Sequence, residues 1–410
     1  MHVNVPIREP FYPTTGEHFI SSGGIRRIER IAATPQLDAP TWHRLLDEWE
    51  DTPRILIAVG QHTGGDAMGQ VLKKITDEFR IPVLGDAVSN LPRHELSITK
   101  HDLFLPQADK EFLRPDLLIT TGKSFISKAY KQFVQAYPPR QHWHISPDPH
   151  IIDTFKSLTV HVPVTPEYFF EKLYEDIDYH RFVQNDEDGQ DESYLEDWME
   201  YERKGRVAVA HYFAKLTKLT DLTALNFVLS QLTANAQVHV ANSMSVRYVN
   251  QLTIENQGIE VYSNRGTSGI DGCVSTAIGA ALQTTRPVYL LVGDVAFFYD
   301  RNGLLIEFLP SNLKIILLNN SGGTIFRLID GPASQPELSA FFETRHDYDA
   351  RRTAGDSGIA YTLAEDMDQL NSGWDAFSNA VGPALLEIKT DPEVSAEQYR
   401  EWKAHLKLIF

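Results

Sequence analysis

The chain has 410 residues, 42% of them apolar and 23% charged, the composition of a globular protein with two or three domains. Asp and Glu number 55 against 38 Lys and Arg, and the formal net charge of −17 argues against nonspecific binding to nucleic acids or anionic membranes. The single cysteine, Cys273, excludes an internal disulfide and fits a reducing compartment. With no run of eighteen apolar residues and no apolar signal core at its start, the sequence predicts a cytoplasmic protein.

The first part of the chain divides into a connector and a domain. Residues 1–25 are rich in proline and carry little periodicity, so we expect an extended interdomain connector with a further domain upstream of it. Residues 26–180 predict a central α/β domain, because short apolar runs alternate with segments of helical spacing. The predicted strands are 54–60, 82–86, 116–122, 143–146 and 158–164, and the predicted helices are 67–79 and 127–137.

An acidic stretch separates this domain from a second one. Residues 186–197 hold seven acidic residues and no basic one, which predicts a solvated linker over 181–197. Residues 198–410 again alternate strands with helices. Both domains are therefore predicted to be doubly wound parallel sheets. The second domain has predicted strands at 238–241, 288–294, 314–319 and 384–390 and predicted helices at 222–232, 272–283, 302–309 and 396–408.

Two neighbouring strands of the second domain end in polar residues. Asp294 ends the run VYLLVGD, and Asn320 ends the next run, KIILLNN, which continues as SGG. Because the carboxyl ends of parallel strands share one edge of a sheet, these side chains are expected to converge there with the backbone carbonyl of Gly322. Three hard oxygen ligands suit Mg²⁺. Ordinary turn chemistry is the alternative reading of Asp, Asn and Gly at strand ends.

Two further segments favour anion binding. The loop SNRGTSGIDG, residues 263–272, runs into a helix of small residues, so its backbone N–H groups and Arg265 form a candidate site for an anion or a carboxylate. A tight turn with close helix packing explains the same loop equally well. Asn242 ends the run VHVAN, Ser243 is predicted to cap the helix that follows, and Arg247 lies one helical turn further on. A surface salt bridge is the simpler role for Arg247.

Three motifs together resemble a known family. SNRGTSGIDG, VGDVAFFYDRNGL and LLNNSGGTIF resemble the thiamine-diphosphate enzymes and, among them, the 2-succinyl-5-enolpyruvyl-6-hydroxy-3-cyclohexene-1-carboxylate synthase (MenD) family of menaquinone biosynthesis. The two predicted domains would then be the central and the diphosphate-binding domains. The opening HVNVPIREPFYP resembles a stretch that in this family follows an amino-terminal pyrimidine-binding domain. We therefore expect a fragment, or one half of a split enzyme, without that domain.

The resemblance also implies roles for individual residues. The implied Mg²⁺ (or Mn²⁺) ligands are Asp294, Asn320 and Gly322. The implied cofactor-binding residues are Ser268, Gly269, Ile270, Gly293, Asp294 and Asn320, with Ile270 as an apolar support. The implied substrate-binding residues are Asn242, Ser243, Arg247, Arg265, Ile325 and Phe326. Lys128 falls near a basic position of the family, but its neighbour is Ala129 where an arginine is expected. No catalytic residue is assigned in this chain, because the activating glutamate of the family belongs to the pyrimidine-binding domain.

The implied activity is a carboligation with thiamine diphosphate and magnesium as cofactors. 2-Oxoglutarate is decarboxylated, its succinyl semialdehyde unit is added to isochorismate, and CO₂ is released. The implied partners are these substrates and a pyrimidine-binding domain from the same or a neighbouring subunit of a homo-oligomer. Without that domain we expect no turnover. The alternatives are another carboligase or decarboxylase of the superfamily, a subunit of a split enzyme, and a non-catalytic cofactor-binding module.

Three residues are assigned structural roles in the sequence. His142 and His144 alternate along one predicted strand but have no apparent third metal ligand. Cys273 lies near a helix start, where small-residue packing explains it.

Overall fold

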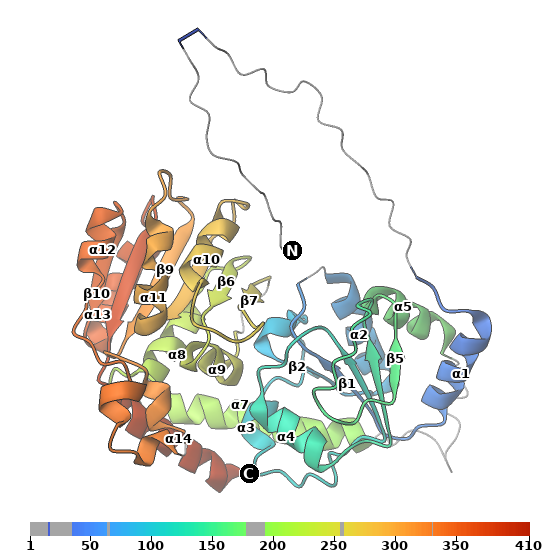
Figure 1. Cartoon of the computed structure of the whole chain (residues 1–410). Coiled ribbons are helices and arrows are strands. Elements are labelled where there is room, and N and C mark those ends of the chain that lie inside the picture. The colour runs from blue at the N-terminus through green and yellow to red at the C-terminus, as the bar shows by residue number, and fades with distance from the viewer. Residues whose placement is uncertain (1–14, 17–34, 64–65, 178–192, 255–257, 330) are drawn as a thin grey trace. The chain divides into compact units, whose positions relative to one another are not determined.

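A computed structural model describes residues 15–16, 35–63, 66–177, 193–254, 258–329 and 331–410 (Figure 1). The chain separates into the units Met1–Thr34 and Pro35–Phe410, and all helices and strands given below belong to the second unit. Apart from residues 15–16, the predicted connector at 1–25 lies outside the described residues. Among the helices that are described, none has the length and apolar character needed to cross a membrane.

The first sheet is five-stranded, all-parallel and ordered β2-β1-β3-β4-β5. Its strands are β1 (Ile55–Val59), β2 (Val83–Gly85), β3 (Leu117–Thr121), β4 (Gln141–Ile145) and β5 (Val160–Val162). Every residue of β1 is buried. Ile55, Ile57 and Val59 belong to one hydrophobic cluster and Leu56 and Ala58 to another, so the alternation of strand side chains supplies a core on each face.

Helices cover both faces of this sheet. The first cluster includes residues of α1 (Ala39–Glu50), α2 (Asp66–Phe79) and α5 (Pro166–Asp176). The second includes residues of α3 (His101–Phe104), α4 (Lys128–Ala136) and the long helix α7 (Ser193–Phe213). A short 3₁₀ turn, η1 (Ala87–Ser89), follows β2. The predicted acidic linker is wrong at its end, since residues 193–197 form the start of α7, where Tyr194 and Leu195 are buried; residues 178–192 lie outside the described residues.

The second sheet is six-stranded, all-parallel and ordered β10-β11-β9-β8-β6-β7. Its strands are β6 (Gln237–Val240), β7 (Glu260–Tyr262), β8 (Val288–Gly293), β9 (Leu313–Asn319), β10 (Ala360–Ala364) and β11 (Ala384–Lys389). From β6 the chain adds β7 on one side and then β8, β9 and their neighbours on the other. The strand order thus reverses between β6 and β8, and such a reversal opens a crevice at the carboxyl ends of the strands.

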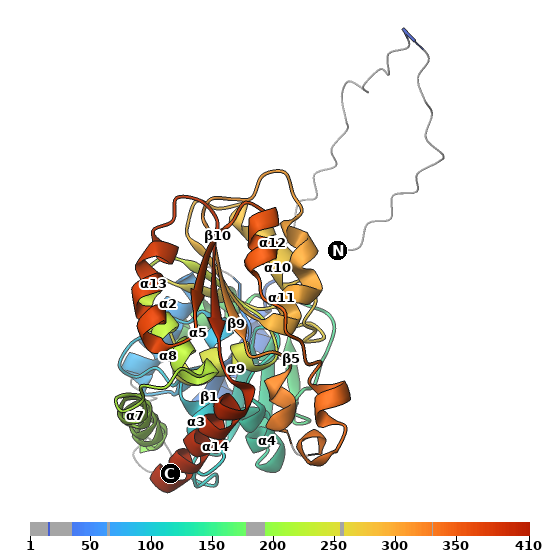
Figure 2. The ribbon, with the colours of Figure 1, turned by 90° about the vertical axis from the view of Figure 1, so that its left-hand side faces the viewer.

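This sheet also has helices on both faces. One face packs α8 (Asp221–Gln231), α9 (Met244–Leu252), α13 (Met367–Ser378) and α14 (Pro392–Ile409), and the other packs α10 (Cys273–Ala281), α11 (Asp294–Asp300) and α12 (Arg351–Asp356). Figure 2 shows α13 on one side of the sheet and α10, α11 and α12 on the other. The remaining turns are η2 (Arg301–Leu304), η3 (Thr324–Arg327), η4 (Pro332–Ser334) and the π-helical turn η5 (Leu338–Phe342).

One predicted helix, 302–309, is wrong. The crossover helix is α11, which begins at Asp294 directly after β8, and only the 3₁₀ turn η2 follows it. Leu305 and Phe308 are largely exposed. Their apolar spacing therefore has no partner surface, and an isolated short helix without packing is unstable in water.

Buried polar contacts join elements that pack on the two sheets. Asp86, after β2, accepts hydrogen bonds from Asn250 Nδ2 of α9 (3.0 Å) and from the amides of Ile126 and Ser127 at the start of α4, and it lies 3.1 Å from His101 Nε2. Burial raises the pKa of Asp86, but His101 and these donors outweigh it and hold the pKa below its ordinary value. An ionised carboxylate thus ties α9 to α4.

Candidate active site

The carboxyl ends of three adjacent strands converge on one pocket. Asn242 follows β6, Asp294 follows β8 and Asn320 follows β9, and all three line a pocket of about 410 Å³. The pocket lies where the strand order reverses. The other predicted site residues that line it are Ser243, Ile270, Gly293, Gly322, Ile325 and Phe326.

Asp294 is buried at the first turn of α11. Its Oδ1 accepts the amide of Val295 (2.6 Å), and its Oδ2 accepts the amide of Gly322 (2.9 Å). His346 Nε2 lies 3.4 Å from Oδ2, and the amide of Tyr348 donates to His346 Nδ1 (3.2 Å). His346 Nε2 makes no hydrogen bond within the part of the chain that the structure describes. The amides of Val295 and Gly322 thus hold the carboxylate, from the start of α11 and from the turn after β9.

Asn320 is 8% exposed and held by a second carboxylate. Its Nδ2 donates to Asp221 Oδ2 (2.7 Å), while its buried Oδ1 has no hydrogen-bond partner among the residues that the structure describes. Asp221 lies in the first turn of α8, and Thr390 Oγ1 donates to its Oδ1 (2.5 Å). Burial, together with the charge of Asp294, raises the pKa of Asp221 to about 6 against the effect of these hydrogen bonds.

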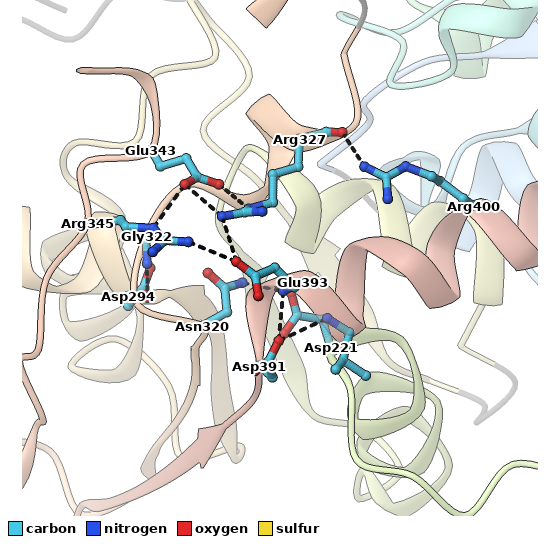
Figure 3. A network of polar contacts seen from close by, with 11 residues as sticks. Asp221, Asp294, Asn320, Gly322, Arg327, Glu343, Arg345, Asp391, Glu393 and Arg400 are labelled. Carbon is cyan, nitrogen blue, oxygen red and sulfur yellow. Dashed lines mark hydrogen bonds and ion pairs between the residues drawn. The ribbon is translucent and has the colours of Figure 1, made fainter. Parts of the chain in front are cut away.

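The backbone at Gly322 requires glycine. Its φ is +149°, and a Cβ at this position would lie 2.6 Å from the carbonyl oxygen of Glu343. That carbonyl accepts the amide of Gly323 (2.6 Å). The side chain of Glu343, only 2% exposed, forms ion pairs with Arg327 and Arg345 (Figure 3). The close approach thus holds the residues after β9 against the segment that includes Glu343.

Asn242 organises the loop at 263–272. Its Nδ2 donates to the carbonyls of Asn264 (2.7 Å) and Gly269 (2.7 Å), and its Oδ1 accepts from Arg265 Nη1 (2.7 Å). A buried amide with all these partners fixes the loop relative to the end of β6. Ser268 and Gly269 belong to this loop and do not line the pocket.

The two arginines lie beside the pocket and do not line it. Burial and the charge of Arg247 lower the pKa of Arg265, whose buried Nε has no hydrogen-bond partner within the described ranges. Burial and the charge of Arg265 lower the pKa of Lys131 on α4. Arg247 Nη1 donates to the carbonyl of Ser243. Basic groups from α9, the loop and α4 therefore share one region, whereas Lys128 is exposed.

The predicted cap of α9 is wrong. Ser243 occupies the capping position, but its side chain accepts no capping hydrogen bond. Its φ of 71° and ψ of −129° lie outside the extended conformation that side-chain capping needs. A non-glycine residue in such a conformation is strained, and strain of this kind is characteristic of functional sites.

The residues at the strand ends fit a hard divalent cation. A buried amide oxygen without a partner is rare in a native structure, and a cation satisfies it. The Asp294 carboxylate adds a charged oxygen. The Gly322 carbonyl accepts the amide of Thr324 (3.2 Å), and a carbonyl oxygen has a second lone pair that a cation can use. Among the described residues, no group of three His, Cys, Asp or Glu side chains is placed to hold a metal. A cation at this pocket would therefore need the mixed carboxylate, amide and carbonyl set.

The residues given structural roles have protein partners. The hydroxyl of Thr120 bonds both His142 Nε2 (2.9 Å) and His144 Nδ1 (3.0 Å). Cys273 is buried, and burial raises the pKa of its thiol, which disfavours the reactive thiolate.

Sequence reasoning missed part of the pocket. Asp221 and Glu343 line it and come from α8 and from the residue after η5, and no strand-end signal marks them. His346, which lies beside Asp294 but does not line the pocket, was missed as well. In the sequence, Asp221 is marked only by its place after Thr220, a pair typical of a helix start. Phe341 and Phe342 also line the pocket, although Phe341 is 78% exposed.

Comparison with known proteins assigns a family to this geometry. Residues 31–171 match the family model described as "Middle domain of thiamine pyrophosphate". The chain is 37% identical over 407 residues to the 2-succinyl-5-enolpyruvyl-6-hydroxy-3-cyclohexene-1-carboxylate synthase of Cytophaga hutchinsonii, with 98% of this chain and 70% of the relative covered. The synthases of Flavobacterium johnsoniae and Flavobacterium psychrophilum are each 32% identical, with 97% and 96% of this chain and 70% and 69% of the relatives covered. The chain therefore belongs to the family of 2-succinyl-5-enolpyruvyl-6-hydroxy-3-cyclohexene-1-carboxylate synthases, which are thiamine pyrophosphate enzymes.

Proposed function

We propose that the pocket at the ends of β6, β8 and β9 is the diphosphate- and metal-binding half of a 2-succinyl-5-enolpyruvyl-6-hydroxy-3-cyclohexene-1-carboxylate synthase site. One observation carries the proposal: Asn320, whose buried Oδ1 has no hydrogen-bond partner among the described residues, lines the same pocket as Asp294. In a chain of this family, the oxygens of these two side chains would suit a magnesium ion bound together with a diphosphate.

Three residues would hold the metal, and others would bind the cofactor. Asp294, Asn320 and the carbonyl of Gly322 are the proposed Mg²⁺ (or Mn²⁺) ligands. The proposed cofactor contacts are Ser268, Gly269, Ile270 and Gly293 together with Asp294 and Asn320. Thiamine diphosphate, when bound, supplies the electron sink for decarboxylation of a 2-oxo acid.

The residues of the chain itself exclude water and orient the substrates. Ile270, Ile325 and Phe326 give the pocket an apolar wall, which strengthens electrostatic interactions inside it. Ser243 stands at the start of α9, the helix that carries Arg247. Asn242 holds the 263–272 loop, which carries Arg265. Two arginines suit 2-oxoglutarate and isochorismate, because each substrate carries two carboxylates.

Turnover is proposed to need a pyrimidine-binding domain beside these 410 residues. The activating glutamate of the family belongs to that domain, and we assign no catalytic residue among the residues of this chain. The domain would come from the same or a neighbouring subunit of a homo-oligomer, acting in the cytoplasm.

Product analysis tests the reaction. The chain is mixed with a separately produced pyrimidine-binding domain, thiamine diphosphate, Mg²⁺, 2-oxoglutarate and isochorismate, and the products are identified by mass spectrometry. We expect the carboligation product and CO₂, with loss of both when either cofactor is omitted. If CO₂ forms at the same rate without isochorismate, and no adduct forms when isochorismate is present, the chain belongs to a decarboxylase. If adducts form only with other acceptors, it belongs to another carboligase.

A further inference from the structure

The amide of Asn320 has two orientations with opposite consequences for a cation. One presents Oδ1, an acceptor, to the pocket, and the other presents Nδ2, which carries two hydrogens and repels a cation. In the structure Oδ1 is buried and has no hydrogen-bond partner in the described part of the chain, and Nδ2 lies 2.7 Å from Asp221 Oδ2. Whatever fixes this orientation decides whether the pocket can bind a metal.

Asp221 has the chemistry to fix it. An ionised carboxylate accepts hydrogen bonds and donates none, so it can face only the Nδ2 side of an amide. Asp221 is 1% exposed, and its other oxygen already accepts the hydroxyl of Thr390 (2.5 Å). The amide of Asp221 donates to Ser395 Oγ (3.2 Å), which anchors its backbone. The carboxylate thus has no freedom to turn away from Asn320.

We propose that Asp221 is a positioning residue for the metal, which sets the Asn320 amide with its oxygen toward the cation. The inference rests on the proposed function, because it takes Asn320 as a metal ligand. Asp221 lies 99 positions before Asn320 on a different element, and both residues belong to the polar network in Figure 3. Both residues also line the pocket. Outer partners of this kind typically change metal affinity by about 10- to 100-fold when they are removed.

Metal affinity measured with a spin probe tests the proposal directly. Mn²⁺ is titrated into the chain with thiamine diphosphate and the pyrimidine-binding domain present, and the free ion is followed by electron paramagnetic resonance. Asp221→Leu and Asp221→Ala both remove the acceptor, and each is expected to raise the Kd for Mn²⁺ about tenfold or more. Asp221→Asn retains an acceptor oxygen for Asn320 Nδ2, so its Kd should stay within about threefold of the unaltered value.

Two controls separate positioning from folding. Thr390→Val removes the other hydrogen bond to Asp221 but leaves the contact with Asn320, so we expect its Kd to rise less than that of Asp221→Ala. Thermal unfolding without metal is recorded for every variant, and only variants that unfold cooperatively are compared. Asp221→Ala serves if the leucine variant fails to fold, because it adds no bulk.

The outcomes are distinguishable. If the unaltered chain and Asp221→Asn bind Mn²⁺ alike while Asp221→Leu and Asp221→Ala bind it weakly, the positioning role stands. If Asp221→Ala binds Mn²⁺ as tightly as the unaltered chain, the role of Asp221 is wrong but the proposed function survives. If the unaltered chain binds no Mn²⁺, or Asn320→Ala binds it normally, the metal site itself is wrong and the inference falls with it.

Discussion

Arg265 is half-buried beside the pocket, and its charge has no carboxylate partner among the described hydrogen bonds and ion pairs. Its Nη1 donates to Asn242 Oδ1 (2.7 Å), while its buried Nε has no hydrogen-bond partner among those residues that are described. Burial and the charge of Arg247 lower the pKa of Arg265. A bound carboxylate would offset both the loss of solvation and the repulsion between the two arginines. These properties suit a group that binds an anionic substrate.

The first prediction concerns this residue. Arg265→Met is expected to lower kcat/KM for 2-oxoglutarate by about 10- to 100-fold, because hydrogen bonds to charged groups contribute about 1.5–3 kcal/mol. The kcat/KM of Arg265→Lys should lie between those of Arg265→Met and the unaltered chain, since lysine keeps the charge but lacks the planar guanidinium group. Steady-state kinetics with the pyrimidine-binding domain present measure the effect. Arg352→Met, at an exposed position, is the control and should leave the ratio unchanged; equal losses in both variants would contradict a substrate role.

Residue patterns alone located only part of the site. The sequence around Asp294 and Asn320 predicts converging oxygens, because each residue directly follows an apolar run and parallel strands end at one edge. Asp221 could not be predicted, since its contact with Asn320 depends on how the start of α8 packs against the end of β9. The failed cap at Ser243 has a similar cause: side-chain capping needs an extended backbone, and the structure holds this residue at positive φ.

At the scale of elements, the turn after β9 depends on one backbone conformation. Gly322→Ala would put a Cβ 2.6 Å from the carbonyl oxygen of Glu343 at a φ of +149°. The second prediction is that this change displaces Gly322 from Asp294, raises the Kd for Mn²⁺ by tenfold or more, and lowers the free energy of unfolding by about 1–3 kcal/mol. Gly355→Ala is the control, because no atom lies within 4 Å of its added Cβ. Equal metal affinity in both variants would contradict the role of this turn.

The position of α9 depends on a contact with a residue that follows the first sheet's β2. Asn250 donates through Nδ2 to Asp86 (3.0 Å) and accepts the amide of Ala87 through Oδ1 (2.9 Å). The third prediction is that Asn250→Leu lowers the free energy of unfolding by about 2–5 kcal/mol, because two buried polar groups lose a partner. Urea unfolding measures this.

The same change should also act on the site. Since α9 carries Arg247, loosening its anchor is expected to raise KM for 2-oxoglutarate more than it changes the Kd for Mn²⁺. Asn371→Leu, on an exposed position of α13, is the control for stability. A stable Asn250→Leu variant with unaltered KM would refute the coupling between Asp86 and α9.

Elements were predictable where their burial is uniform. Strands such as β1, β8 and β9 lie between two helical layers, so nearly every residue is apolar and the run is easy to recognise. The helix expected at 302–309 failed because apolar spacing cannot reveal that Leu305 and Phe308 stay exposed. The strand β10 was missed because its residues are mostly half-buried, which leaves no continuous apolar run.

At the scale of the whole molecule, two buried histidines make stability depend on pH. Burial lowers the pKa of His142 and of His239 to about 4, from an ordinary value of 6.5. Between these values the unfolded chain binds protons that the folded chain does not, so acid favours unfolding. Each histidine thus contributes stability that is present above pH 6.5 and is lost as the pH falls toward 4.

The fourth prediction follows from this sign. His142→Gln cannot titrate, so its free energy of unfolding should fall less between about pH 6.5 and about pH 4.5 than that of the unaltered chain, by an amount of order 2 kcal/mol. Urea unfolding across this range measures the slope. His43→Gln, at an exposed position, should keep the slope of the unaltered chain. A His142→Gln slope as steep as that of the control would contradict the burial argument.

The sequence predicts parallel strands that alternate with helices, but it does not predict the order of the strands in each sheet. Which strand lies beside which depends on the crossovers, and the reversal between β6 and β8 is visible only in the folded chain. That reversal nevertheless accounts for the site, since it brings the ends of β6, β8 and β9 to one pocket.

The most direct measurement is product formation from 2-oxoglutarate and isochorismate, with thiamine diphosphate and Mg²⁺, by the 410-residue chain alone and with an added pyrimidine-binding domain. We predict no product from the chain alone and turnover once the domain is added, with loss of that turnover in Asp294→Ala. Product from the chain alone would contradict the need for a glutamate from that domain. Turnover that persists in Asp294→Ala would contradict the assignment of the pocket as the metal- and diphosphate-binding half of the site.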